Sequence, residues 1–323
     1  MVEQGEGGSI VLISSAAGLI DVGAGDRGYR QQAMSRTDPV AQTALGPMVL
    51  AATEQYEGPR RLVDDDLAES FLPTPLRAMT RLMRWRMPRE WSIRAAERSQ
   101  PGLWANLSCR KRFIDEKLDA ALPDIDAVVI LGAGMDTRAY RLARHSAIPV
   151  FEVDLPVNID RKRAVVRRAL GAVPDSVRLI PVDFEHDDLA TQLSRYGHHT
   201  SDRTFFAWEG VTQYLTEAGV RATFDYLGTA VPGSRLVFTY VRADFIDGTH
   251  RYGAESLYRR FCVRRQIWRF GLNPEDIAPF IEPYGWQLIE QAGPDYLIEH
   301  YVNPAGRKLG ASQVEWTAYA LRQ

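Results

Sequence analysis

Cysteine is nearly absent from this chain, which has only Cys109 and Cys262 among its 323 residues. Two cysteines cannot form the disulfide framework of a small secreted protein or a cysteine-rich zinc site. A strong charge of one sign is also missing, because 39 Lys and Arg residues face 41 Asp and Glu residues and leave a formal net charge of −2. This balance provides no global attraction to nucleic acid or to an anionic membrane.

Long apolar runs are lacking as well. No stretch has the length and hydrophobicity of a membrane span, and Glu3 and Glu6 stand where a secretory signal would carry positive charge. The chain is long enough for two domains or for one elaborated α/β domain with a large core. We therefore expect a cytoplasmic protein that has no membrane span, binds no nucleic acid and holds no metal.

A glycine turn is the most informative stretch that is present. The apolar run at 128–131 leads into Gly132 and Gly134 and then into helix-forming residues, which predicts a buried strand, a tight turn and a helix start. Such a turn lets a ligand approach the backbone closely. Thr137 replaces the third glycine of dinucleotide-binding turns, which disfavours a pyrophosphate and suits S-adenosylmethionine (SAM). Asp154 suits the ribose of either cofactor, so the turn alone decides nothing.

Strands and helices are expected to alternate after this turn, as in a doubly wound parallel sheet. Asn273 and Pro274 predict the cap and first position of a further helix. The last two strands have no obvious helix between them, so they either pair antiparallel or sit apart. The strands expected after the first lie at 149–154, 177–184, 204–211, 234–241, 286–291 and 313–321, with a helix at 216–231.

The first third of the chain has a different character. Residues 9–18 resemble a strand of short-chain dehydrogenases, but no lysine of the chain has a tyrosine four positions before it, so that family's catalytic pair is missing. From residue 36 to 122 the pattern is helical. Asp66 and Glu69 have the spacing of an N-terminal capping box, and residues 79–86 suggest a partly solvated helix.

Four motifs in the second part of the chain follow one another in a recognisable order. Together they resemble the leucine carboxyl methyltransferase family, and more closely its bacterial branch of SAM-dependent methyltransferases. The resemblance covers residues 36–323. The motifs are Leu131-Gly132-Ala133-Gly134-Met135-Asp136-Thr137-Arg138, Phe151-Glu152-Val153-Asp154-Leu155-Pro156, Pro181-Val182-Asp183-Phe184 and Trp208-Glu209-Gly210-Val211-Thr212-Gln213-Tyr214-Leu215.

The resemblance implies a fold and a division of the chain. The fold is the α/β, Rossmann-like sheet of class I methyltransferases, with seven strands of which the last pair is antiparallel. The methyltransferase domain spans 36–323, with an N-terminal helical cap at 36–122 and a lid insertion at 242–272. Residues 1–35 have no counterpart in the family and form an N-terminal extension.

The resemblance also implies how SAM is bound. Gly132 and Gly134 would pass under its methionine part, and Arg110 would pair with the methionine carboxylate, with Arg112 as the alternative. The remaining roles fall to residues at strand ends. Asp154 would bind the ribose hydroxyls, Asp183 the adenine amino group, Phe184 the adenine ring, and Glu209 the methionine ammonium or the reaction centre.

The expected reaction is methyl transfer from SAM to a carboxylate or hydroxyl oxygen of a small or lipophilic molecule. A hydroxyl acceptor needs a base and a carboxylate does not; Tyr240, His250 and His300 are candidate bases, none of them within a motif. Leu257, Phe261 and Trp268 can share one helical face of the lid, which could instead be a basic amphipathic helix for a membrane surface or a partner. Two alternatives stay open: an NAD(P)-dependent oxidoreductase, and a SAM-binding protein without turnover.

Overall fold

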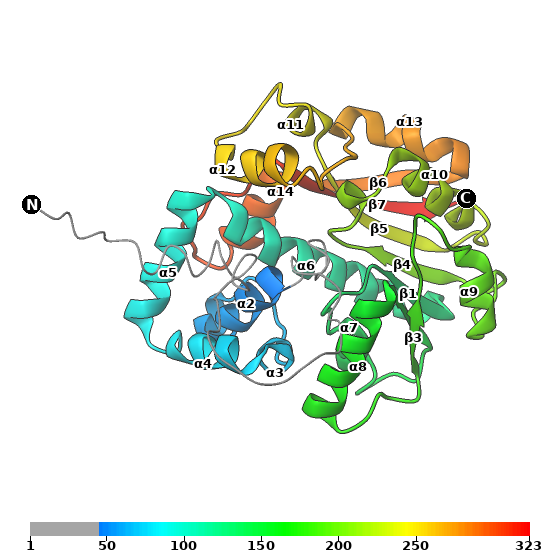
Figure 1. Cartoon of the computed structure of the whole chain (residues 1–323), viewed down its shortest axis with the longest axis horizontal. Helices are drawn as coiled ribbons and strands as arrows, with labels where there is room; N and C mark the ends of the chain where they lie inside the picture. The colour runs from blue at the N-terminus through cyan, green and yellow to red at the C-terminus, as the bar shows by residue number, and fades with distance from the viewer. Residues whose placement is uncertain (1–44) are drawn as a thin grey trace, which may run out of the picture.

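One mixed sheet of seven strands forms the centre of the protein in a computed structural model, which describes residues 45–323 (Figure 1). The strand order is β3-β2-β1-β4-β5-β7-β6. The first five strands are parallel, and β7 runs antiparallel to both of its neighbours, β5 and β6. The strands are β1 Ala127–Leu131, β2 Val150–Asp154, β3 Val177–Pro181, β4 Thr204–Trp208, β5 Arg235–Val241, β6 Trp286–Ala292 and β7 Glu315–Arg322.

The central strand β1 is buried along its whole length because helices cover both faces of the sheet. Val128 and Ile130 pack on one side with the N-terminal helices, whereas Val129 and Leu131 pack on the other. The second side is covered by α9 (Leu189–Arg195), α10 (Glu217–Leu227) and α13 (Ile277–Ile281). This arrangement confirms the expected α/β sheet and its antiparallel last pair.

The first face of the sheet is covered by helices from both ends of the chain. Glu54, at the end of α2, joins several of these segments: its carboxylate accepts hydrogen bonds from Trp104 Nε1 at 2.6 Å and Leu62 N at 2.8 Å, and it pairs with Arg307. The helices are α2 Leu45–Glu54, α3 Ala68–Phe71, α4 Thr74–Leu82, α5 Arg86–Ser99, α6 Leu103–Ala121, α7 Arg138–Leu142, α8 Pro156–Leu170 and α14 Pro294–Leu297.

Two local predictions in and around the helices are wrong. The capping box does not form: α3 starts at Ala68, and Asp66 pairs with Arg144 at 2.6 Å instead. The helix expected at 79–86 is interrupted between α4 and α5. Asn273 and Pro274 do start a short 3₁₀ turn, Pro274–Asp276, as expected, but the Asn273 side chain makes no cap and its Oδ1 accepts a hydrogen bond from Asp244 N at 3.3 Å. The stretch between β6 and β7 contains α14 and a π-helical turn, Ile298–Val302, that the sequence pattern did not indicate.

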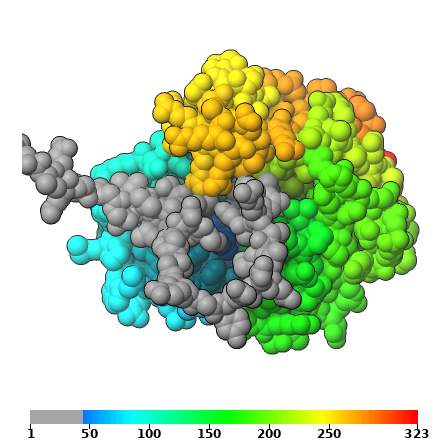
Figure 2. Space-filling view, in the orientation of Figure 1, coloured from blue at the N-terminus to red at the C-terminus, as the bar shows by residue number. Residues whose placement is uncertain are grey.

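The segment between β5 and α13 is irregular and contains only short helical elements, α11 Ala243–Ile246, α12 Glu255–Tyr258 and a π-helical turn, Arg259–Arg264. The expectation of one continuous helix is therefore wrong, and Trp268 lies beyond the turn. Its ring nevertheless stacks on Phe261, with centroids 4.9 Å apart. In Figure 2 this segment, coloured yellow to orange, borders both the cyan N-terminal helices and the green half of the sheet.

The predicted extension at 1–35, and the first residues of the predicted helical cap, lie outside the described residues. Within residues 45–323, every helix is too short or too polar to cross a lipid bilayer.

Candidate active site

A cavity of about 580 Å³ opens at the carboxyl ends of the parallel strands. This edge is where open α/β sheets bind ligands, and the volume suits a small molecule. Its walls come from the loops after β1, β3 and β4, the end of β2, helices α2, α5 and α6, the segment after β5 and the start of β7. The cavity therefore joins segments from nearly the whole described chain.

The glycine turn after β1 forms part of the cavity wall. Gly132 has φ +69° and Gly134 has φ +43°, a backbone region that favours glycine. A Cβ atom on Gly132 would lie 2.1 Å from Val211 Cγ2. The turn is also fixed to the next strand, because the N–H groups of Gly132 and Ala133 both donate to the Val153 carbonyl. Glycine is thus required at position 132 for two independent reasons.

Asp154 ends β2 and lies beside this turn. Its carboxylate accepts hydrogen bonds from Gly134 N at 2.5 Å, from Leu155 N at 2.7 Å and from Asn158 Nδ2 at 2.7 Å. Burial raises the pKa of Asp154, and these hydrogen bonds oppose that rise. A carboxylate has about four acceptor sites, so the three contacts leave room for a ligand hydroxyl.

Asp183 and Phe184 follow β3 and also line the cavity. Asp183 lies in a turn, where its carboxylate accepts from Glu185 N at 3.0 Å and contacts His186 Nδ1 at 3.0 Å. Phe184 is partly buried against the second face of the sheet. The structure thus brings both residues to the same opening as Asp154 and the glycine turn.

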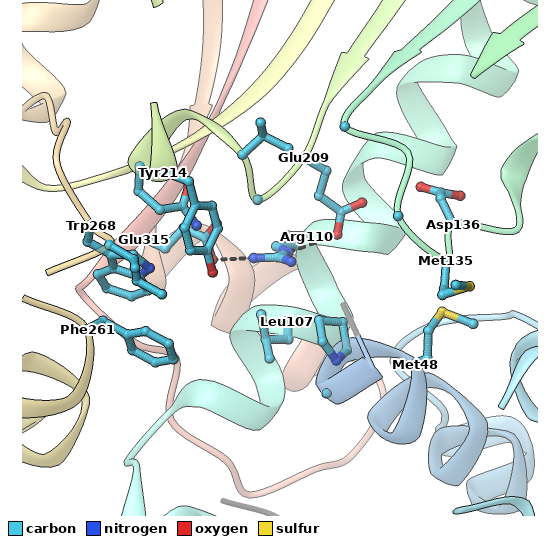
Figure 3. A pocket seen from close by; sticks show the side chains of 18 of the residues that line it. Met48, Leu107, Arg110, Met135, Asp136, Glu209, Tyr214, Phe261, Trp268 and Glu315 are labelled. Atoms are coloured by element: carbon cyan, nitrogen blue, oxygen red, sulfur yellow. Dashed lines mark hydrogen bonds and ion pairs between the residues drawn. The ribbon is translucent and has the colours of Figure 1, made fainter. Parts of the chain in front are cut away.

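Arg110 of α6 crosses the middle of the cavity between two carboxylates (Figure 3). Its Nε lies 2.9 Å from Oε1 of Glu209, and its Nη1 pairs with Glu315. Burial by itself would lower the pKa of Arg110, but the two carboxylates raise it, so the guanidinium stays charged. Its Nη2 group lies beside Gly210, 3.3 Å from the position that a Cβ atom there would take.

Glu209 follows β4 and is surrounded by cations. Arg138 Nη1 lies 2.6 Å and Lys111 Nζ 3.9 Å from its Oε2. Burial would raise the pKa of Glu209, but the three neighbouring cations hold it at about 2. Arg138 also pairs with Asp136, which extends the ion cluster to the glycine turn. Glu209 is therefore a fixed negative charge at the centre of the site.

The other end of the cavity is aromatic. Figure 3 shows Tyr214, Phe261 and Trp268 on the far side of Arg110 from Met135 and Asp136. The rings of Tyr214 and Trp268 meet edge to face at 6.5 Å. Three buried oxygen atoms that belong to cavity-lining residues lack a hydrogen-bond partner in the described part of the chain: Asn106 Oδ1, Gln213 Oε1 and Glu315 Oε1.

The candidate bases are not brought to the cavity. Tyr240 is buried in the second face of the sheet and donates to Gln291 Oε1 at 2.7 Å. His250 is exposed, 3.5 Å from Asp244, and His300 stacks on Tyr296. Arg112, the alternative to Arg110, pairs with Glu116 at 2.9 Å, outside the cavity lining.

A buried ion pair between Lys162 and Glu152 contacts the backbone of the glycine turn. Lys162 Nζ donates to the Ala133 carbonyl at 3.1 Å and pairs with Glu152 at 2.5 Å. The hydroxyl of Tyr140 donates to the other oxygen of Glu152 at 2.6 Å. Burial raises the pKa of Glu152 to about 7 although Lys162 and Tyr140 lower it. This group ties β2 and α8 to the turn.

Several residues that the sequence analysis did not single out take part in the site. Lys111, Arg138 and Glu315 complete the ion cluster around Arg110 and Glu209. Thr137, which the sequence analysis noted only as the replacement of the third glycine, donates from its Oγ1 to Asp65 Oδ1 at 2.7 Å and so links the glycine turn to the N-terminal helices. Among residues 45–323 no group of three or more His, Cys, Asp or Glu side chains is placed to hold a metal ion.

Sequence comparisons identify relatives of this chain among known proteins. A sequence model described as leucine carboxyl methyltransferase matches residues 44–228. Proteins of Mycobacterium bovis and Mycobacterium marinum, both provisionally named S-adenosyl-L-methionine-dependent methyltransferases, are each 36% identical. They align over 214 and 216 residues, which cover 65% and 66% of this chain and 69% and 66% of theirs.

Among solved structures, a provisionally assigned methyltransferase from Thermobifida fusca is 18% identical. The structural alignment covers 74% of this chain and 89% of the Thermobifida fusca chain, with a TM-score of 0.49. Because the family model matches more than half of its length, this chain belongs to the leucine carboxyl methyltransferase family.

Proposed function

We propose that this SAM-dependent methyltransferase transfers the methyl group to an oxygen atom of a small or lipophilic acceptor. The observation that carries the proposal is the place of Arg110, between the glycine turn on one side and the aromatic end of the same cavity on the other. A cofactor held at the turn and an acceptor held among the rings would then meet beside Arg110. Methyl transfer needs such an in-line approach of two ligands.

The residues at the turn suit SAM, which supplies a methyl group on a positively charged sulfur. Arg110 Nη2 would donate to the methionine carboxylate, and Glu209 would attract the ammonium group. Asp154 would accept from a ribose hydroxyl. Opposite charges side by side match a zwitterionic amino acid better than a pyrophosphate, which carries negative charge only.

The adenine end would lie beside the loop after β3. Asp183 would accept a hydrogen bond from the adenine amino group, and Phe184 would pack on the ring. Thr137 supports the same choice of cofactor, because its hydroxyl is committed to Asp65 and its side chain fills the position of the third glycine. The NAD(P)-dependent alternative lacks a comparable observation in its favour.

Three unpaired oxygen atoms support a hydroxyl rather than a carboxylate as the acceptor group. A hydroxyl can donate to the oxygen atoms of Asn106, Gln213 and Glu315 and can also accept from the unpaired Trp268 Nε1, whereas a carboxylate can only accept. Glu315 would accept the hydroxyl proton as the oxygen forms its bond to the methyl carbon and the carbon–sulfur bond breaks. This assignment gives the reaction a base that neither Tyr240 nor His250 supplies.

Two parts of the chain would enclose the acceptor. We assign residues 242–272 as a lid and residues 36–122 as a helical cap of the methyltransferase domain, 36–323. Phe261 and Trp268 of the lid face Leu107 of the cap across the cavity (Figure 3). Closure over these apolar side chains would remove water from the reacting groups.

Thermal unfolding with SAM, S-adenosylhomocysteine, NAD and NADP tests the cofactor. A ligand at a hundred times its dissociation constant adds about 2.7 kcal/mol of stability. We expect the SAM pair alone to shift the transition, and Asp154→Ala to abolish the shift. Asp160→Ala is the matched control, because Asp160 lies on α8 with its side chain 77% exposed. A shift with NAD or NADP alone would overturn the proposal.

Turnover is tested separately with a panel of phenols, alcohols and carboxylic acids, by following release of S-adenosylhomocysteine. Glu315→Gln should lower turnover of a hydroxyl acceptor. A hydroxyl acceptor that the unchanged protein and Glu315→Gln methylate equally well would overturn the role of Glu315, and methylation of carboxylic acids alone would overturn the choice of a hydroxyl. A protein that binds SAM but methylates nothing in the panel would support the reading as a SAM-binding protein without turnover.

A further inference from the structure

The turn between α4 and α5 exposes an unusual concentration of large apolar side chains. Leu82, Trp85, Met87 and Trp91 are 52%, 51%, 83% and 50% exposed. The other large exposed hydrophobic residues are spread singly over distant parts of the described chain. Single exposed residues need no explanation, but a cluster of this kind marks an interaction surface.

These four side chains belong to two consecutive helices and the turn that joins them. α4 ends at Leu82 and α5 begins at Arg86, so the residues between them form a short turn. Met87 and Trp91 are four residues apart and neighbour each other on α5, whereas Ser92 and Ile93 are buried. The turn between α4 and α5 lies at the margin of the molecule, away from the sheet (Figure 1), whereas Ser99 at the other end of α5 accepts a hydrogen bond from Ser256 of the segment after β5.

Arginine side chains surround the apolar residues. Arg81, Arg86 and Arg94 have side chains that are 64%, 78% and 68% exposed. The guanidinium of Arg84 lies over the ring of Trp85, 4.1 Å from its centroid. Only two carboxylates, those of Glu69 and Glu90, pair with the exposed arginines. The surface therefore carries net positive charge although the whole chain is slightly acidic.

We propose that this α4–α5 surface binds the face of an anionic lipid membrane. Tryptophan is favoured at the interface between lipid headgroups and acyl chains, and arginine is attracted by anionic headgroups. An amphipathic helical segment with both residue types lies in the plane of that interface. Met87 is the most exposed of the four side chains, which suits insertion into lipid.

The position of the surface gives binding a consequence. The same helix α5 continues to Ala96 and Ser99, which line the cavity. A membrane bound at the start of α5 would therefore lie close to the helix whose other end lines the cavity in which the acceptor is proposed to bind. This consequence rests on the proposed function, because it concerns a lipophilic acceptor, but the binding itself does not.

Flotation of the full chain with two kinds of vesicle tests the proposal without any assay of turnover. One kind contains phosphatidylcholine alone, and the other contains phosphatidylcholine with phosphatidylglycerol. We expect binding to the anionic vesicles, little binding to the neutral ones, and weaker binding as salt is raised. Trp85→Ser/Met87→Ser should weaken binding at least about tenfold, and Arg84→Gln/Arg86→Gln about thirtyfold.

Ile289→Ser is the matched control, since Ile289 is 50% exposed on the distant strand β6. It should bind vesicles like the unchanged protein. Far-ultraviolet circular dichroism establishes that each variant is folded, and indole fluorescence should shift to the blue on binding, by less where Trp85 is replaced and only Trp91 remains on the surface. The proposal is overturned if anionic vesicles fail to bind at low salt, or if all variants bind equally. If anionic vesicles fail to bind, we would infer that the surface binds a protein partner instead.

Discussion

Arg110 Nε lies 2.9 Å from Oε1 of Glu209, a residue 99 positions further along the chain. The pair joins α6, from the N-terminal helices, to the loop after β4, at the centre of the cavity. Both side chains are buried, so their attraction is little screened by water or salt. One ion pair thus holds the helical layer to the ligand-binding edge of the sheet.

Replacing Glu209 with glutamine should destabilise the protein strongly. The substitution removes the carboxylate that faces Arg110, Arg138 and Lys111, although Arg110 keeps Glu315 and Arg138 keeps Asp115 and Asp136. Removing one partner of a buried ion pair costs about 3–5 kcal/mol, because the buried positive charge is then less well compensated. We expect a loss of at least about 3 kcal/mol in the free energy of unfolding in denaturant, and loss of the stabilisation by SAM.

Glu217→Gln is the control for Glu209→Gln. Glu217 pairs with Arg221 at 2.8 Å across one turn of α10, but its side chain is 64% exposed. Exposed pairs of this kind contribute little to stability, so Glu217→Gln should unfold at the same denaturant midpoint as the unchanged protein. Equal midpoints for the two variants would contradict the structural role of the ion cluster.

Gly132→Ala should lower the free energy of unfolding through two effects. The backbone at φ +69° disfavours a side chain, and the new Cβ would lie 2.1 Å from Val211 Cγ2. Gly306→Ala isolates the first effect, because Gly306 has φ +64° and no atom within 4 Å of its Cβ position. We expect a loss of about 1 kcal/mol for Gly306→Ala and at least about 3 kcal/mol for Gly132→Ala in denaturant unfolding.

A second substitution tests whether contact with Val211 causes the difference. Val211→Ala removes the atom that is 2.1 Å away and leaves Val211 Cβ at 3.2 Å. The double variant Gly132→Ala/Val211→Ala should therefore recover part of the stability that Gly132→Ala loses. If the two effects add without recovery, backbone strain rather than the clash dominates at this turn.

The sequence predicted the sheet and one half of the site because both depend on local patterns. The buried strand β1, the glycine turn and Asp154 belong to one strand–turn–helix unit and its neighbour, with recognisable spacing. Arg110, Asp183 and Glu209 came from the family resemblance, and the structure brings all three to the cavity. Their binding roles stay predictions.

The other half of the site depends on contacts between distant segments. Glu315 begins the last strand, and only the pairing of Val241 with Glu315 brings it to the carboxyl end of β5. Had the antiparallel register been considered, this acid at the strand start could have been noticed. Phe261 and Trp268 converge through an irregular turn, and such turns leave no periodic pattern in the sequence.

The pH dependence of stability should reveal the buried carboxyl group beneath the turn. Burial raises the pKa of Glu152 from 4.5 to about 7 in the folded protein. Between these two values the folded state keeps a proton that the unfolded state has lost, so stability falls as pH rises. The fall should total about 3 kcal/mol and be complete just above pH 7.

Variants at Glu152 and Lys162 isolate the contribution of Glu152 to the pH dependence of stability, because the other titrating groups are the same in the variants and in the unchanged protein. In Glu152→Gln/Lys162→Met the ionic pair is gone, while Tyr140 can still donate to the glutamine oxygen. The free energy of unfolding of this variant relative to the unchanged protein should rise by about 3 kcal/mol between pH 4.5 and 7. Lys162→Met alone removes the cation that lowers the pKa of Glu152, so its fall in stability should extend above pH 7. Parallel pH profiles for all three proteins would show that Glu152 is ionised throughout, with Lys162 as an intact counter-ion.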